Sequence, residues 1–281
     1  MGKLSAHLDN IAFSHSIFAL PFAYIGAFLA QGGLPSGADL LFITLAMVGA
    51  RSAALALNNL IDLKYDRIHP RFTQRPMVTG AVKPREAVLL IIASLLLFLG
   101  AVLNLDPICL KFWPVALAPL VIYPYMKRFS WTCHLVLGLA LALAPVGAWV
   151  AIRGSADAPV LWMGLAVGLW IAAFDVIYGC QDVDFDKAQG LNSMPVRFGI
   201  SGALVLSRLM HAVSIGCFIA AGWLYHLAPV YYLGVVLAGA VLIYQHAIVN
   251  PRDFRNITQA YFLRNGLVGM LMLGFTLLSL F

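Results

Sequence analysis

The stretch that decides the fold runs from Asp39 to Asp66 and reads DLLFITLAMVGARSAALALNNLIDLKYD. It is apolar over enough residues to cross a bilayer, because a membrane helix needs about 20 of them. If the helix continues to the end of the stretch, Asn58, Asp62 and Asp66 recur every four residues and share one face. Stacked carboxylates repel one another, but Mg²⁺ binds carboxylate oxygens and bridges them to phosphate, which removes the repulsion.

A second acidic segment repeats this pattern. Asp182 and Asp186 are again four residues apart and again follow a long apolar run. Each acidic pair, taken alone, is equally well explained as a solvated helix end. Two such pairs in a chain with only 12 acidic residues favour one shared site, because carboxylates at a membrane edge are functional more often than not.

The composition predicts an all-α, polytopic membrane protein in a lipid bilayer. Of the 281 residues 62% are hydrophobic and 11% charged, against about 25% charged in soluble domains. Unbroken apolar runs of this length indicate helices. We predict a single domain over 1–281 with about nine spans, near 11–31, 39–60, 87–104, 108–125, 133–152, 159–181, 201–225, 229–249 and 260–281.

The basic residues are distributed unevenly between the two sides of the membrane. Most follow the predicted second, fourth, sixth and eighth spans: Lys64, Arg67, Arg71, Arg75, Lys83, Arg85, Lys127, Arg128, Lys187, Arg197, Arg252 and Arg255. The opposite loops carry only Lys111 and Arg153. The positive-inside rule explains the net charge of +6 without a nucleic-acid partner. It places the N-terminus and both acidic segments in the cytoplasm and the C-terminus outside, in the cell's inner (plasma) membrane.

Two charged residues lie inside apolar runs, where an ionised side chain is costly. Asp175 precedes Asp182 by seven residues, with Tyr178 between them, so all three side chains can share a face with Asp186. We expect Asp175 to hold an arginine or to act near a substrate. Arg51, about two turns before Asn58, pairs with Asp175 or binds the carboxylate of an acidic substrate, and the sequence leaves both open.

With these features the chain resembles the UbiA superfamily of intramembrane aromatic prenyltransferases over nearly its whole length. The family's motifs recur in order: NxxxDxxxD as Asn58, Asp62 and Asp66, an RPLPSG-like segment at 74–80, YxxxK as Tyr123 and Lys127, and DxxxD as Asp182 and Asp186. The segment 15–23, HSIFALPFA, is also similar to family N-termini. Two positions depart from the pattern, with Asn59 where Asp is common and Asn192 where many members have Lys.

The resemblance implies nine transmembrane helices around a central cavity capped by cytoplasmic loops. It implies that a cluster of polar side chains holds Mg²⁺ and, through it, a polyprenyl diphosphate: Asn58, Asp62, Asp66, Asp182 and Asp186. Further side chains are then expected on the diphosphate side: Arg67, Arg75, Tyr123 and Lys127, with Tyr178 near the substrate. The implied reaction is prenyl transfer to an aromatic acid such as 4-hydroxybenzoate in quinone biosynthesis.

Other functions remain to be weighed against this one. Prenylation of a naphthoate in menaquinone biosynthesis would use the same motifs. An ion-coupled transporter would use Arg51 and Asp175 as a relay and should carry acidic residues near mid-membrane in both halves, whereas most carboxylates lie at the predicted cytoplasmic edge. The acidic signature of CDP-alcohol phosphotransferases is absent from the sequence.

Overall fold

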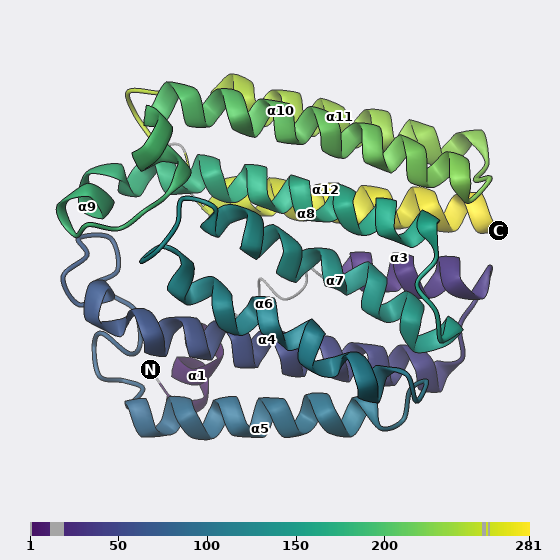
Figure 1. Cartoon of the computed structure of the whole chain (residues 1–281), viewed down its shortest axis with the longest axis horizontal. Helices are drawn as coiled ribbons and strands as arrows, with labels where there is room; N and C mark the ends of the chain where they lie inside the picture. Colours follow the sequence, from purple (N-terminus) through teal and green to yellow (C-terminus); the bar gives the residue numbers. More distant parts are fainter. Residues whose placement is uncertain (1, 12–19, 255–256, 258) are drawn as a thin grey trace.

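The protein is an all-helical bundle in which most helices run side by side along the long axis of the molecule (Figure 1). The computed structural model describes residues 2–11, 20–254, 257 and 259–281. The helices in this part are α1 Lys3–Asn10, α3 Leu20–Gln31, α4 Gly37–Asp66, α5 Pro84–Val102, α6 Cys109–Met126, α7 Cys133–Arg153, α8 Ala158–Gly179, α9 Val183–Ala188, α10 Met194–Leu224, α11 Pro229–Ile248 and α12 Gln259–Leu280. The predicted fold class is therefore confirmed.

Seven helical segments are long and apolar enough to cross a membrane, and they comprise α4, α5, α6, α7, α8 together with α9, α10 and α11. The apolar helices α3 and α12 lie where the first and last spans are predicted. The predicted first span, and the similarity noted at 15–23, include residues 12–19, which fall outside the described part of the chain. The chain is thus a multi-pass membrane protein, and the count of nine spans stays a prediction.

Small residues let α7 approach its neighbours closely. A Cβ atom added at Gly138 would lie 2.3 Å from the carbonyl oxygen of Gly168 on α8, and one added at Gly26 on α3 would lie 2.2 Å from that of Pro145. Helices in a bilayer associate through such backbone contacts, because lipid offers no hydrophobic driving force between them. Helix α7 is therefore fixed against both α3 and α8.

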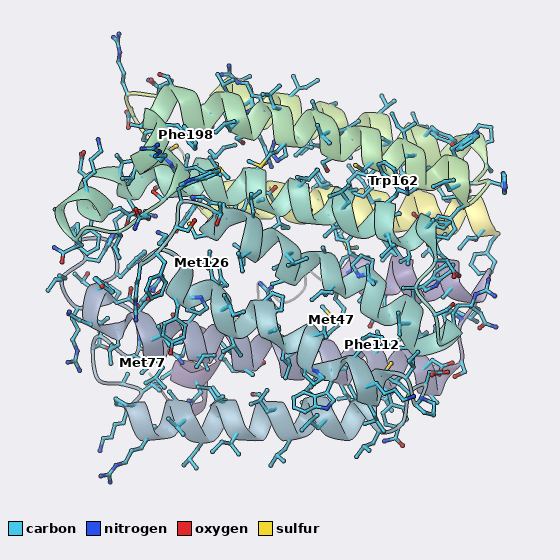
Figure 2. The ribbon with its side chains drawn as sticks, in the orientation of Figure 1. Met47, Met77, Phe112, Met126, Trp162 and Phe198 are labelled. Atoms are coloured by element: carbon cyan, nitrogen blue, oxygen red, sulfur yellow. The ribbon has the colours of Figure 1, made fainter. Side chains whose placement is uncertain are left out.

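Both acidic segments lie at one end of the bundle, which we call the acidic end and define by residues 62–75, 127–128 and 182–186. Helix α4 starts at its Ser36 cap, whose hydroxyl accepts a hydrogen bond from the backbone N–H of Asp39, and continues without a break to Asp66. The loop after α4, the short helix α9 and helix α1 gather at this end, and the C-terminus lies at the opposite end (Figure 1). In Figure 2, Met77 and Met126 lie toward the acidic end, whereas Phe112 and Trp162 lie toward the other end.

The second acidic segment has a different backbone. Helix α8 ends at Gly179, a 3₁₀ turn spans Cys180–Asp182, and α9 begins at Val183. Asp175 and Asp186 therefore do not lie on one continuous α-helix, as the shared-face prediction assumed. Asp182 in the turn and Asp186 in α9 are both buried.

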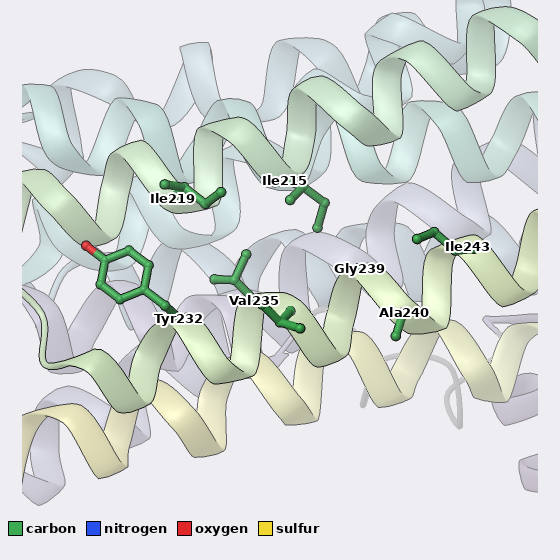
Figure 3. A pocket seen from close by; sticks show the side chains of 8 residues that line it. Ile215, Ile219, Tyr232, Val235, Gly239, Ala240 and Ile243 are labelled. Carbon is green, nitrogen blue, oxygen red and sulfur yellow. The ribbon is translucent and has the colours of Figure 1, made fainter.

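An apolar cavity of about 340 Å³ lies between α10 and α11 (Figure 3). Its lining consists mainly of aliphatic side chains: Ile215, Ile219, Tyr232, Val235, Val236, Gly239, Ala240 and Ile243. No acidic or basic residue lines this cavity. The lining is therefore almost entirely apolar, whereas the charged side chains gather at the acidic end, which is the candidate functional site.

Candidate functional site

The first acidic segment presents two carboxylates at the end of α4, each with a cationic partner. Arg75 donates from Nη1 to Oδ2 of Asp66 at 2.6 Å. Arg128 donates from Nη2 to the carbonyl oxygen of Ile61 at 2.9 Å and lies 3.4 Å from Oδ1 of Asp62. The repulsion between Asp62 and Asp66 is thus offset by guanidinium groups from two different loops.

The second acidic segment is balanced in the same way. Arg71 donates from Nη1 to Oδ1 of Asp182, and its Nη2 donates to the hydroxyl of Tyr178 at 2.9 Å. Lys127 donates from Nζ to Oδ2 of Asp186 at 3.4 Å. Asp182 and Asp186 are nearly inaccessible to solvent, and a buried carboxylate stays charged only when it is paired.

The partners of the two segments come from the same two places in the chain. The loop after α4 supplies Arg75 to the first segment and Arg71 to the second. The end of α6 supplies Arg128 to the first segment and Lys127 to the second. The structure therefore brings the two acidic segments, more than 100 residues apart in sequence, into one charge network.

His69 lies between the two segments. Its Nδ1 accepts a hydrogen bond from the backbone N–H of Arg71 at 3.2 Å, and its Nε2 lies 3.3 Å from Oδ1 of Asp182. Burial lowers the pKa of His69 below its usual value, while the carboxylates of Asp182, Asp186 and Asp66 act in the opposite direction. Because Nδ1 accepts, a neutral ring carries its proton on Nε2, facing Asp182.

The carboxylates around Lys127 stabilise the charged form of its amine. Burial disfavours the ammonium group, but the carboxylates of Asp186 and Asp175 outweigh burial and raise the pKa of Lys127 above its usual value. Its backbone carbonyl also accepts a hydrogen bond from the N–H of Asn192 at 2.6 Å. The departure from the family pattern at Asn192 thus lies directly beside a predicted diphosphate contact.

Asp175 has a partner that was not expected from the sequence. Its Oδ2 lies 2.7 Å from Nδ1 of His134, a buried residue near the start of α7. Arg51 and Asp175 form no ion pair in the described part of the structure. The described partner of Asp175 is therefore His134 and not Arg51, and binding of a substrate carboxylate by Arg51 stays a prediction.

The other predicted side chains differ in their burial and in their distance from the charge network. Asn58 and Tyr123 are half-buried, and among the described residues their side chains form no hydrogen bond. Arg67 is exposed just beyond α4 and, within the same part of the chain, forms no ion pair. Asn59 turns away from the acidic segments and donates to the carbonyl oxygen of Asn10 at the end of α1.

Sequence reasoning did not single out Arg71, Arg128, His69 or His134. Arg71 lies between Arg67 and Arg75 in one basic loop, and spacing alone does not tell which of the three side chains turns inward. Arg128 adjoins a predicted residue and is typical of a membrane-interface ending. A polar residue inside an apolar run was the available signal for His134.

The donor set suits Mg²⁺, although the carboxylates are engaged with cations. Four carboxylates meet at one end of the bundle, and oxygen anions are the ligands that Mg²⁺ prefers. Among the described residues no group of three acidic, histidine or cysteine side chains converges on one point. Metal binding would therefore exchange carboxylate–cation pairs for carboxylate–metal contacts and release the cations for an anionic ligand.

The fold and the acidic end together define a multi-pass membrane protein with one charged site at an end of its helical bundle. Comparison with known proteins specifies this class further. The profile of the UbiA prenyltransferase family matches residues 19–267. The 4-hydroxybenzoate octaprenyltransferase of Vibrio atlanticus is 31% identical over 86% of this chain and 84% of its own length. That of Alkalilimnicola ehrlichii is 32% identical over 90% and 86%. The chain belongs to the UbiA family and is a prenyltransferase.

Solved structures agree with this assignment. The apo structure of a UbiA homologue from Aeropyrum pernix K1 superposes with a TM-score of 0.86 and 35% identity, over 95% of this chain and 98% of that chain. A UbiA homologue from Archaeoglobus fulgidus bound to DMAPP and Mg²⁺ has a TM-score of 0.77 at 23% identity, over 99% of both chains. The second likeness concerns the fold alone.

Proposed function

We propose that the protein transfers a polyprenyl group from a polyprenyl diphosphate to an aromatic acid of the 4-hydroxybenzoate type, in a reaction that requires Mg²⁺. The observation that carries this proposal is the single charge network formed by both acidic segments and four cations. Relatives named 4-hydroxybenzoate octaprenyltransferase support the acceptor class. Homologues bound to Mg²⁺ with DMAPP or GPP support the donor class.

Asn58 and the four carboxylates of the network would hold the metal. When bound, Mg²⁺ neutralises diphosphate charge and thereby assists cleavage of the bond between carbon and oxygen. Arg75, Lys127 and Tyr123 are proposed to contact the diphosphate, with a weaker contribution from exposed Arg67. Arg71 and Arg128 join this group because they already lie on the carboxylates.

The remaining roles concern the acceptor. Cleavage of the donor leaves an allylic cation, and a bundle interior that excludes water protects it from hydrolysis. The ring carbon ortho to the hydroxyl attacks this cation and then loses its proton. We propose that Arg51 binds the carboxylate of the acceptor. We propose that Asp175 orients the acceptor ring or accepts its proton. Tyr178, whose hydroxyl accepts a hydrogen bond from Arg71, is proposed to contact the substrate.

The proposed setting is the inner membrane, with the acidic end facing the cytoplasm. The basic loops gather at that end, and the positive-inside rule places them on the cytoplasmic side. The diphosphate group of the donor and a soluble aromatic acid would then both meet the site at the cytoplasmic side, while the prenyl chain lies among apolar side chains. Because the chain belongs to a family of prenyltransferases, its family membership does not support the transporter alternative.

The test is a transfer assay in membranes that contain the protein. One defined polyprenyl diphosphate is incubated with Mg²⁺ and a panel of aromatic acids, and the product is identified by mass. A prenylated hydroxybenzoate is expected from the wild-type protein but not from the Asp62→Ala or Asp182→Ala variant. Wild-type turnover in both variants would contradict the proposal, and a product formed only from a naphthoate would replace the acceptor with that of menaquinone biosynthesis.

A further inference from the structure

His134 is a deeply buried histidine near the acidic end, with only 1% of its surface exposed. Its Nδ1 lies 2.7 Å from Oδ2 of Asp175. Because an ionised carboxylate offers only acceptors, Nδ1 carries a proton and donates it to this hydrogen bond. Among the described residues its buried Nε2 has no hydrogen-bond partner, so within this part of the chain the imidazole forms one hydrogen bond, and that bond is to Asp175.

The backbone of two helices is shaped to place this ring. Gly138 on α7 and Gly168 on α8 touch through their backbones, one turn after His134 and two turns before Asp175 respectively. At Gly179 an added Cβ atom would lie 3.1 Å from Cε1 of His134 and 3.8 Å from its Nε2. A larger residue at 179 would press on the ring, so Gly179 provides the space in which the ring lies against Asp175.

Asp175 faces the site from the packed face of α8. Its side chain keeps 20% of its surface exposed, while Val176 and Ile177 beside it are fully buried. Its charge helps to raise the pKa of Lys127. Among the described residues His134 is the one hydrogen-bond partner of this carboxylate, so Oδ1 is left for another ligand.

We propose that His134 is a positioning residue for prenyl transfer, which holds Asp175 from behind through Oδ2 and aims Oδ1 at the acceptor ring. The inference rests on the proposed function. After the ring carbon has bonded to the prenyl carbon, its C–H bond breaks. The electron pair of that bond restores aromaticity, and the proton passes to Oδ1 of Asp175. The resulting carboxylic acid keeps its hydrogen bond with His134 until the proton leaves to solvent.

A rigid orienting partner matters here because the carboxylate is mobile without one. A free aspartate rotates about two side-chain bonds, and a base that is displaced by about 1 Å can lose two orders of magnitude in rate. Because the ring of His134 is buried, it stays in place when a substrate leaves the site. We therefore expect the hydrogen bond to affect the rate of the chemical step rather than the binding of either substrate.

The experiment compares kcat and KM for both substrates among full-length variants in membranes. His134→Leu removes the hydrogen bond, whereas His134→Asn replaces Nδ1 with an amide nitrogen at a similar place. His211→Leu is the matched control, since His211 is equally buried and bonds to His246 at 2.8 Å, but on α10. Thermal unfolding of each variant measures the structural cost of losing a buried histidine.

We expect His134→Leu to lower kcat by at least about tenfold, with each KM within about twofold of the wild type, because general-base catalysis contributes about 10²–10⁴ in rate. His134→Asn should recover most of that loss, and the control should keep kcat while losing similar stability. Equal kcat losses in His134→Leu and His211→Leu, or no recovery with Asn, would overturn the role of His134 while wild-type activity upholds the proposed function. A wild-type protein that transfers no prenyl group would overturn both.

Discussion

The two acidic segments reach the same place by different backbone routes. The first ends an uninterrupted 30-residue helix, so Asp62 and Asp66 are one α-helical turn apart by construction. The second follows a 3₁₀ turn that breaks α8 from α9. What the segments share is their charge balance, because each takes one cation from the loop after α4 and one from the end of α6. The site is therefore defined by matched charges rather than by a repeated backbone.

Two carboxylates, one from each segment, differ in how far solvent can compensate for a lost partner. The Asp62 side chain is 28% exposed, whereas that of Asp186 is 3% exposed. Water can solvate the first carboxylate when its cation leaves, but not the second. We infer that the Lys127–Asp186 pair contributes more to stability than the Arg128–Asp62 pair, while both segments are equally necessary for chemistry.

The largest expected effect is the loss of one carboxylate from either segment. Asp62→Asn and Asp182→Asn keep the shape but remove a charge, and each should lower transfer by about 10³-fold, the upper range for removing one preorganised electrostatic contact. Transfer rates at saturating Mg²⁺ provide the measurement. Asp184→Asn is the matched control, because Asp184 belongs to the second segment but is exposed, and it should stay near the wild-type rate.

The contrast in burial predicts unequal effects on stability. Lys127→Met leaves Asp186 buried without its partner, and breaking a buried pair costs about 3 kcal/mol or more. Arg128→Met leaves the more accessible Asp62 unpaired, for which about 1 kcal/mol is expected after solvent screening. Thermal unfolding in the same detergent compares the two variants. Equal losses would show that burial does not distinguish these two ion pairs.

Arg71 and Arg67 differ in what supports a role for them. The structure places Arg71 in the charge network, whereas only the family resemblance predicts a role for Arg67. Arg71 touches Asp182 and Tyr178, whereas Arg67 is exposed. Arg71→Gln should raise the KM for the diphosphate by about tenfold, since a charge-assisted hydrogen bond is worth about 1.5–3 kcal/mol. Arg67→Gln should raise it less. A larger effect at Arg67 would mean that the loop rearranges when substrate binds.

The smallest expected effect concerns the helix contact that supports the second segment. Gly138→Ala places a methyl group against the carbonyl oxygen of Gly168, and overpacking of this kind costs about 1–3 kcal/mol, partly offset by the better helix propensity of alanine. Gly147→Ala, on the same helix with open space around it, should be neutral or stabilising. The difference between their unfolding temperatures measures the contact.

Much of this architecture could be predicted from the sequence. Apolar runs locate the helices, and the spacing of Asn58, Asp62 and Asp66 locates the end of α4, because both follow from local periodicity. The 3₁₀ turn at Cys180–Asp182 could not be predicted, since it depends on how α9 packs. Arg71 and His134 could not be assigned either, because their partners are distant in sequence and are brought close only by the packing of the helices.

The central claim is that both acidic segments bind one metal–diphosphate complex, and Mn²⁺ binding tests it most directly. Mn²⁺ replaces Mg²⁺ at oxygen ligands, and its free form is measured by electron paramagnetic resonance in the presence of geranyl diphosphate. The claim predicts that Asp62→Asn and Asp182→Asn each weaken the same binding event by at least about tenfold, the usual range for a disturbed metal site. If either variant bound Mn²⁺ as tightly as the wild type, the two segments would not share a site.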